Sequence, residues 1–540
     1  MPDVTVMDKV IVEATRPDTP PGPLGLFFHP HPWLFISIGD YEILSRCDTD
    51  ETVAVARHIE DSLTQNKVFL PPEYLPPLAT PMSLIMFNQA PSPAMKALIP
   101  NSFDFVDSAD FGIYHYSFGM AAGGSDVSDF DTHSAVQNRE GKRWLYAGGG
   151  LGRGPIPTGL LFQLSQCRPA LPLWYQYGFI GPCGIFRITN SGRDVIIACA
   201  SWVSAAETEK VVSDYKKTGR LPELPSIGDL LQMQPKGEGH FASDWPSPEI
   251  MAEAALFVRW GLYEHPHASL DDQIARRKVF MKFVERSRTE AATEKLFREC
   301  FGFGYSEMQE RLSRYLVGPA LDAVDTLQTP IISSDPDPQE FSHLSCTEAT
   351  PAQIARMIGD WERMEGDRRR TSDPSLSSLF LKRAGITLHR SYDEGERDPR
   401  FLAVLGLYDV DVGAKAEAVP ILDAAAKAGV RRPAAYSALA ELRLEDARSH
   451  PQAPGGRFDP DQLASVLSPL FQTRKISRLD AKGYELVAEA WSESAKKPSL
   501  RNLAVLKEGM TLYPFDSELA AESAKTYEQW GYNKESAVSK

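Results

Sequence analysis

The sequence lacks several signals that would assign it to a class directly. Its six cysteines form no CxxC pair, so a structural zinc site of that kind is not expected. It has no apolar run of about 18 residues, so no transmembrane helix is expected. It also has no long Lys/Arg run, and its net charge is -15, which argues against a nucleic-acid binder. No secretory signal follows Met1, so we expect a cytoplasmic protein, or an exported one whose signal peptide was removed before this numbering.

The composition is that of a globular chain with several domains. Hydrophobic residues make up 43% of the 540 residues and charged residues 24%. We expect an α+β protein with four segments. These are an α/β subdomain at 1–120, an α/β plus helical domain at 121–320, a linker with a helical segment at 321–396, and an all-α repeat domain at 397–540.

Short-range patterns support this division. Leu34–Ile38 and Tyr41–Ser45 are apolar runs joined at Gly39-Asp40, which predicts a tight hairpin. A second hairpin is expected around the glycine-containing turn at 190–193. After residue 205 the apolar residues recur at helical spacing. The best helix candidates are 249–263, 270–285, 293–301 and 306–316.

The order of elements in the middle of the chain is informative. A predicted helix at 158–167 is followed by LPLWYQYGF at 171–179, the second hairpin, LPEL at 221–224, IGDLL at 227–231 and the helix at 249–263. The block ends in FGFGYSEMQERL at 301–312. This series resembles the peptidase-MA-like branch of the gluzincin metallopeptidases, over roughly residues 30–320. The resemblance implies a zincin fold and export from a bacterial cell.

The residues that carry the chemistry of that family are missing. In the family, the two histidines of a helical H-E-x-x-H motif bind zinc, its glutamate is the general base, and a P-x-W-x-x-E-G segment supplies the third ligand. The resemblance places these positions at Thr158, Gly159 and Phe162, and Tyr177 replaces the third-ligand glutamate. No H-E-x-x-H occurs anywhere in the chain. We therefore predict a pseudoenzyme that has no metal and no cofactor.

The frame around the lost site is retained. Trp174 is expected to be a core aromatic and Gly178 to form a turn. The vestigial cleft would then lie near Trp174, Tyr177 and the three positions on the preceding helix, and it could still bind a peptide.

Two other groups of residues are candidates for a metal site or a disulfide. Asp126, Asp129, Asp131 and His133 form a candidate cation loop, although a solvated polar loop is the stronger interpretation because the EF-hand glycine and distal glutamate are absent. An active hydrolase that uses Asp131 and His133 with a metal remains the alternative function. Cys167 and Cys183 either pair in an oxidising compartment or are buried free thiols.

The last segment has leucines and small residues at regular helical offsets, and it resembles tetratricopeptide-type repeats. Helices are expected at 401–408, 414–428 and 433–445, with Pro420 kinking the second helix or marking its first turn, and a second array through 484–530 follows an insertion at about 446–460. Stacked helix pairs form concave surfaces that bind partners. We therefore predict a protein-binding or scaffold protein with a protein or peptide partner, as a subunit or accessory of a larger assembly; a plain helical bundle is the alternative for this segment.

Overall fold

A computed structural model describes most of the chain between residues 32 and 532. The described parts are 32–45, parts of 49–63, 70–87, the strands within 104–138, most of 164–183, the strands within 186–197, 213–233, 248–262, 269–318, 326–327 and 344–532 apart from 369 and 372. The chain divides into two compact units. Unit 1 combines 1–61, 77–145 and 344–540, and unit 2 combines 62–76 and 146–343.

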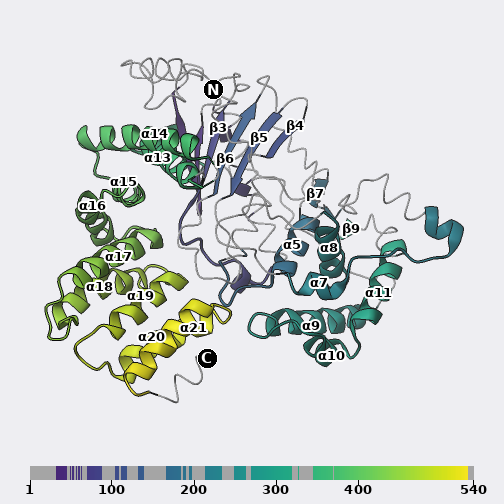
Figure 1. Cartoon of the computed structure of the whole chain (residues 1–540). Coiled ribbons are helices and arrows are strands. Elements are labelled where there is room, and N and C mark those ends of the chain that lie inside the picture. Colours follow the sequence, from purple (N-terminus) through teal and green to yellow (C-terminus); the bar gives the residue numbers. More distant parts are fainter. Residues whose placement is uncertain are drawn as a thin grey trace. The chain divides into compact units, whose positions relative to one another are not determined.

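These units differ from the four segments expected from the sequence, because strands distant in the chain share one sheet. Unit 1 contains a mixed seven-stranded sheet with the order β10-β1-β2-β3-β6-β5-β4 (Figure 1). The sheet crosses the expected boundary at residue 120. Its strands are β1 (Leu34–Ile38), β2 (Tyr41–Ser45), β3 (Met82–Phe87), β4 (Asp104–Ser108), β5 (Phe111–Ser117), β6 (Thr132–Asn138) and β10 (Thr347–Glu348).

The first predicted hairpin is confirmed. β1 and β2 pair antiparallel with Ile38 opposite Tyr41, and Gly39 takes the left-handed conformation that the turn needs, with φ of +56°. β2–β3 and β3–β6 are parallel pairs, whereas the other neighbours are antiparallel. Parallel pairs need long crossover connections, so their order cannot be read from local turns.

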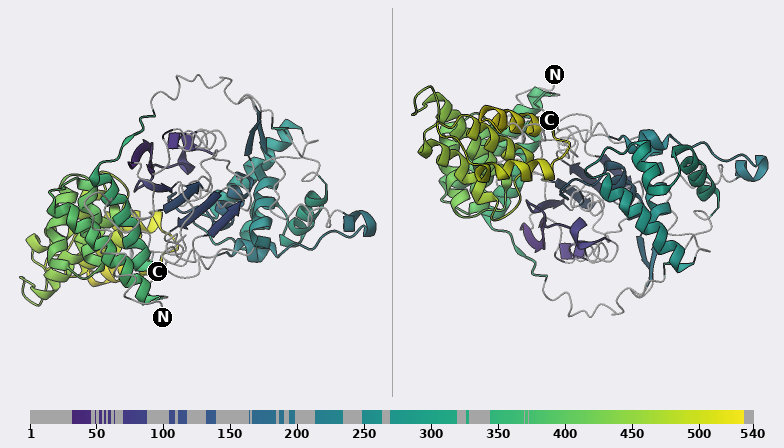
Figure 2. Two further views of the ribbon diagram at one scale, coloured as in Figure 1. Left: turned by 90° about the horizontal axis from the view of Figure 1, so that it is seen from above. Right: turned by 90° about the horizontal axis from the view of Figure 1, so that it is seen from below.

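Stacked helices form the rest of the described part of unit 1 (Figure 1, Figure 2). The pairs α13–α14, α15–α16 and α17–α18 each pack as neighbours, and α19 packs on both α20 and α21. Helices α13, α15, α17 and α19 lie successively side by side. This confirms a helical, repeat-like region at the C-terminal side. Its helices are α13 (Pro351–Arg368), α14 (Pro374–Asp393), α15 (Pro399–Asp411), α16 (Lys415–Lys427), α17 (Pro433–Ser449), α18 (Pro460–Thr473), α19 (Ala481–Ser492), α20 (Leu500–Leu512) and α21 (Ser517–Gln529).

This helical array begins earlier than the sequence predicted. The first pair, α13–α14, lies in the segment that we expected to be a linker with one helical stretch. Close approach within pairs depends on glycine: a Cβ at Gly359 or Gly406 would lie 2.6 Å from Leu388 or Leu422 of the partner helix. Pro420 lies inside α16 rather than at its first turn.

Buried ion pairs attach the array to the sheet within unit 1. Glu42 of β2 is 1% exposed, and its carboxylate binds Arg356 of α13 at 2.8 Å and also Arg400 of α15. These guanidinium groups hold the pKa of Glu42 below its usual range, even though burial acts in the opposite direction as the largest single effect. At the β1–β2 turn, Asp40 pairs with Arg431 at 3.0 Å. The array and the sheet therefore belong to one folded unit.

Unit 2 is built of helices with a small three-stranded sheet of order β7-β8-β9. The second predicted hairpin is confirmed by the antiparallel pair β7–β8, and β9 is a strand inside the segment that we expected to be a linker. The four helices predicted between 249 and 316 are confirmed within two residues at each end. The elements are α5 (Leu173–Cys183), β7 (Phe186–Thr189), β8 (Asp194–Ile197), α7 (Ile227–Leu231), α8 (Pro248–Leu262), α9 (Leu270–Arg286), α10 (Glu294–Phe301), α11 (Tyr305–Val317) and β9 (Thr326–Leu327), with a 3-10 turn at Pro72–Tyr74.

Trp174 and Gly178, the two residues expected to belong to the retained frame, both lie in α5. Trp174 is a core aromatic, as predicted, and only 1% of its surface is exposed. Gly178 does not form a turn: it lies within helix α5, where a Cβ would collide with the carbonyl oxygen of Ala254 on α8. Its lack of a side chain lets the two helices cross closely.

Candidate functional site

The predicted vestigial cleft falls partly outside the described residues. Thr158, Gly159 and Phe162 lie there. Trp174 and Tyr177 are described, and both are buried on α5. The Trp174 ring lies 5.2 Å from Phe257, and burial raises the pKa of the Tyr177 hydroxyl above its usual value. Both side chains are packing residues of the aromatic core.

The structure describes only one of the four residues of the candidate cation loop. Asp126, Asp129 and Asp131 lie outside the described residues, and His133 lies on β6, opposite Ser83 of β3 and Tyr116 of β5. Within the described ranges, no group of three or more His, Cys, Asp and Glu side chains is placed to hold a metal ion.

Cys167 is buried and forms no disulfide. Its Sγ donates a hydrogen bond to the carbonyl oxygen of Tyr74 at 3.4 Å. Pairing with Cys183 is therefore wrong, and the alternative of a buried thiol outside a disulfide holds.

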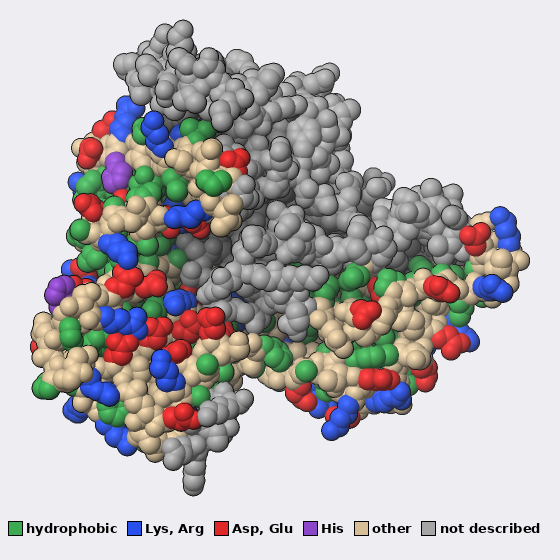
Figure 3. Space-filling model, viewed as in Figure 1, with side chains coloured by type: hydrophobic (Ala, Val, Ile, Leu, Met, Phe, Trp, Pro, Cys, Tyr) green, Lys and Arg blue, Asp and Glu red, His purple; other side chains and the backbone are tan. Residues whose placement is uncertain are grey.

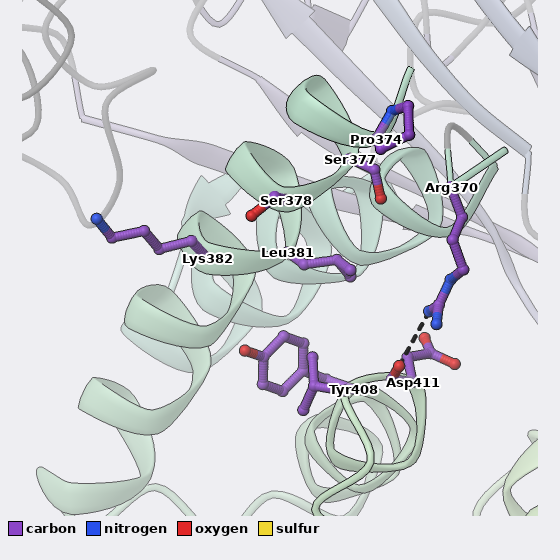
Figure 4. Close-up of a pocket in the computed structure, with 9 residues that line it drawn as sticks. Arg370, Pro374, Ser377, Ser378, Leu381, Lys382, Tyr408 and Asp411 are labelled. Atoms are coloured by element: carbon purple, nitrogen blue, oxygen red, sulfur yellow. Dashed lines mark hydrogen bonds between the residues drawn. The ribbon is translucent and has the colours of Figure 1, made fainter. Parts of the chain in front are cut away.

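A pocket of about 570 Å³ lies in the helical array, between α14, the end of α15 and the α13–α14 connection (Figure 4). Its volume is within the range of small ligand sites. The pocket is lined by Arg370, Pro374, Ser377, Ser378, Leu381, Lys382, Tyr408, Asp411 and Val412.

Helix α14 positions most of the lining side chains. Ser378 and Lys382 are four residues apart and therefore share one helix face, along which Ile386 follows after another four. Ser377 is fixed, because its hydroxyl donates to the carbonyl of Gly366 on α13 at 2.6 Å. Gly385 leaves room for the Tyr408 hydroxyl, with which a Cβ at this position would collide.

Asp411 is the only acid in the pocket lining, and a buried arginine compensates its charge. Arg363, which is 8% exposed, binds its carboxylate at 3.0 Å and also binds Asp360, which in turn binds Arg432 at 2.7 Å. Burial raises the pKa of Asp411, and Arg363 opposes that rise. Arg370 donates to the main-chain oxygen of Asp411 at 2.9 Å, which is the contact drawn in Figure 4.

A histidine–aspartate pair continues the same side of the array. Nε2 of His389 on α14 lies 3.0 Å from the carboxylate of Asp409 on α15, and the His389 ring packs edge-on against Tyr408. Asp409 is completely buried, whereas the His389 side chain is 46% exposed. Burial raises the pKa of Asp409 to about 6, although the nearby imidazole acts in the opposite direction.

A second unusual titratable group lies in unit 2. Glu253 on α8 is 1% exposed and accepts a hydrogen bond from Nε2 of Gln309 on α11 at 3.2 Å. The Gln309 side chain also binds the start of α7, because its Oε1 accepts from the Ile227 N–H at 2.9 Å. Burial raises the pKa of Glu253 to about 7, and Asp229 contributes to the rise. A carboxyl group with a raised pKa is a candidate functional residue. Structural contacts between buried helices also raise the pKa of a carboxyl group.

We expect Glu253→Gln to stabilise unit 2 at pH 8 by up to about 3 kcal/mol and to have little effect at pH 4.5. The folded-state pKa of about 7 lies above the usual value of 4.5, so wild-type stability falls as pH rises through this interval. The amide can still accept from Gln309 without carrying a charge. Thermal unfolding at several pH values measures the effect, and equal midpoint shifts at pH 4.5 and pH 8 would contradict it. Glu223→Gln, at an exposed position that forms no ion pair with any residue that the structure describes, is the control.

The pocket was not predicted from the sequence, because most of its lining residues, from 370 to 382, fall in the segment that was expected to be a linker with a helical stretch. A usable signal was present. Phe380, Ala384 and Leu388 are buried at intervals of four, which is the pattern of a helix with one apolar face. The opposite face, with Ser378 and Lys382, then becomes the one available to a ligand.

No family model, curated protein or solved structure matches this chain. No helix in the described part of the chain has both the length and the apolar character needed to span a membrane.

Proposed function

We propose that this chain is a non-catalytic protein-binding or scaffold protein. In this proposal it is built on an inactive gluzincin-like metallopeptidase frame and carries a tetratricopeptide-like array that contacts a protein or peptide partner. It acts as a subunit or accessory of a larger assembly. The observation that carries the proposal is the pocket between α14 and α15, within an array of stacked helix pairs. Such arrays present extended surfaces on which partner segments lie.

Two further observations support a binding role over catalysis. The chain has no H-E-x-x-H motif, and Trp174 and Tyr177 are used for packing. In addition, exposed apolar side chains accompany the pocket: Val412 is 43% exposed and Ile386 is 41% exposed. Apolar exposure beside polar groups is a common property of protein-binding surfaces.

The test is affinity capture of the full-length protein from an extract of the cells that encode it, with the bound proteins identified by mass spectrometry. The double variant Ile386→Asp/Val412→Asp is expected to lose a specific partner by at least about tenfold, because two charges replace apolar contacts. Ile274→Asp is the matched control, since Ile274 is 57% exposed on α9 and lies outside the array. Equal capture by all three proteins would contradict an array-mediated role.

Deletion of 397–540 is a poor test for this molecule. It would remove Arg400 and Arg431, which pair with Glu42 and Asp40 of the sheet, and would leave those carboxylates without these partners. Metal analysis and a peptidase assay on the intact protein address the alternative. Stoichiometric metal together with peptide hydrolysis would replace the scaffold proposal by an active hydrolase with an atypical site.

A further inference from the structure

We propose that the pocket between α14 and α15 binds an acidic segment of a partner protein. Lys382 and Arg370 bind carboxylates of that segment, and Val412 and Leu381 contact an apolar side chain next to them. This inference rests on the proposed binding function and specifies the chemistry of the ligand at the same site. It is argued from the charges, exposure and shape of the pocket.

The cationic groups of the pocket are available to a ligand. Lys382 is exposed on α14 and forms no ion pair with any residue that the structure describes. Arg370 pairs with Asp367 at 3.1 Å, but both side chains are at least half exposed, and surface pairs of this kind contribute little and exchange readily. In Figure 4 the Arg370 guanidinium points toward Asp411, whereas the Lys382 side chain extends away from the other labelled residues. A ligand segment several residues long is therefore needed to contact both cations.

The acid in the lining does not cancel these cations. The carboxylate of Asp411 is bound by the buried Arg363, so its negative charge is compensated inside the array. Only its main-chain oxygen binds Arg370, a contact that uses one of the five donors of the guanidinium group. Lys382 and Arg370 are the two cationic side chains that line the pocket.

The negative charge of the chain lies mostly outside the helical array, so the array does not strongly repel an acidic partner. Residues 344–540 carry a net charge of -1, whereas residues 1–343 carry -14. In Figure 3 the surface of the array shows Lys and Arg interspersed with Asp and Glu. An acidic segment would therefore meet a nearly neutral array with two local cations.

The apolar part of the pocket favours a peptide over a simple anion. Leu381 and Val412 both line the pocket, and Ile386 is exposed one turn along α14 from Lys382. Free phosphate or another small anion would leave these side chains in water. A segment in which acidic and apolar residues alternate would cover them and also bind both cations.

The experiment measures binding of labelled dodecapeptides to the full-length protein by fluorescence anisotropy. One peptide repeats Ser-Leu-Glu, a second repeats Ser-Leu-Gln and a third repeats Ser-Gly-Glu. We expect the Ser-Leu-Glu peptide to bind about tenfold or more tightly than either of the others. Raising the ionic strength from about 50 mM to about 500 mM should reduce its advantage over the Ser-Leu-Gln peptide, because the shorter Debye length screens exposed charges.

Charge-reversal variants locate the site. Lys382→Glu and Arg370→Glu should each weaken binding of the Ser-Leu-Glu peptide about tenfold or more and leave the Ser-Leu-Gln peptide unaffected. Lys475→Glu makes the same charge change at an exposed position at the end of α18, and it should leave both affinities unchanged. Circular dichroism confirms that the variants fold, which is expected at exposed positions.

Three results would overturn the proposal. These are equal affinity for the glutamate and glutamine peptides, an equal loss in Lys475→Glu and Lys382→Glu, or displacement by inorganic phosphate with no contribution from the leucines. Any of these, combined with loss of captured partner in Ile386→Asp/Val412→Asp, would reject the acidic segment and keep the binding function. Capture that does not depend on the array would reject the binding function itself.

Discussion

Trp174→Ala is expected to lower the free energy of unfolding of unit 2 by about 3–5 kcal/mol. The Trp174 ring is 1% exposed and packs against Phe257, Phe280 and Phe283, with ring centroids 5.2–5.9 Å apart. Removing it leaves a cavity at the contact of α5, α8 and α9 that the surrounding rings can fill only in part. The magnitude exceeds the usual effect of a point mutation, which lies near 1 kcal/mol.

Hydrogen–deuterium exchange of peptides from α5 and α8 measures this loss locally, which is useful because the two units need not unfold together. Ile274→Ala on α9 is the control and should change the exchange free energy by less than about 0.5 kcal/mol, since Ile274 is exposed. If Trp174→Ala left exchange unchanged and altered peptide binding, Trp174 would be a cleft residue and its assignment to the core would fail.

Arg383→Met is expected to destabilise unit 1 by about 3–5 kcal/mol. Arg383 of α14 pairs with Glu362 of α13 at 2.8 Å, and their side chains are 2% and 0% exposed. The substitution leaves the carboxylate of Glu362 buried without its counter-charge. Burial already raises the pKa of Glu362 in the wild type, and Arg383 opposes this rise. The deficit should therefore be largest at high pH and shrink as pH falls, because protonation removes the buried charge.

The double variant Glu362→Leu/Arg383→Met separates the loss of the pair from the loss of packing. Replacing both partners by apolar residues is often neutral or stabilising, so much of the wild-type stability should return. Arg390→Met breaks the exposed pair with Glu394, which directly follows the last residue of α14, and should cost less than about 1 kcal/mol. Urea unfolding followed by circular dichroism compares these variants. A double variant as unstable as Arg383→Met would show that the side-chain packing, and not the unpaired charge, dominates.

The helices of unit 2 could be predicted from local sequence patterns. α9 and α10 begin where Ser269 and Thr293 cap the first turn, and each side chain accepts from a backbone N–H three residues later. Capping and apolar periodicity are properties of adjacent residues, so the sequence predicted these helices within two residues. The β1–β2 hairpin is similar, because Gly39 supplies the conformation that its turn needs.

The array was predicted less completely than unit 2. The regular pattern from residue 397 onward indicated stacked helices, but α13 and α14, which begin at Pro351 and Pro374, lie in the segment expected to be a linker with a helical stretch. In the structure each of these prolines stands at the first position of its helix, where no backbone N–H is needed. The pocket was missed together with these helices.

The sequence by itself determined the short-range elements, the absence of H-E-x-x-H, and the helical character of the C-terminal side. Only the tertiary structure decided which strands share the seven-stranded sheet, that Gly178 lies in a helix crossing, and that Glu42 joins β2 to α13 and α15. The reason is physical: capping, turns and periodicity depend on neighbours within about one or two helical turns, whereas the pairing of Glu42 with Arg356 joins residues 314 positions apart. Burial then decided which charges are compensated and which, such as Lys382, are exposed to a ligand.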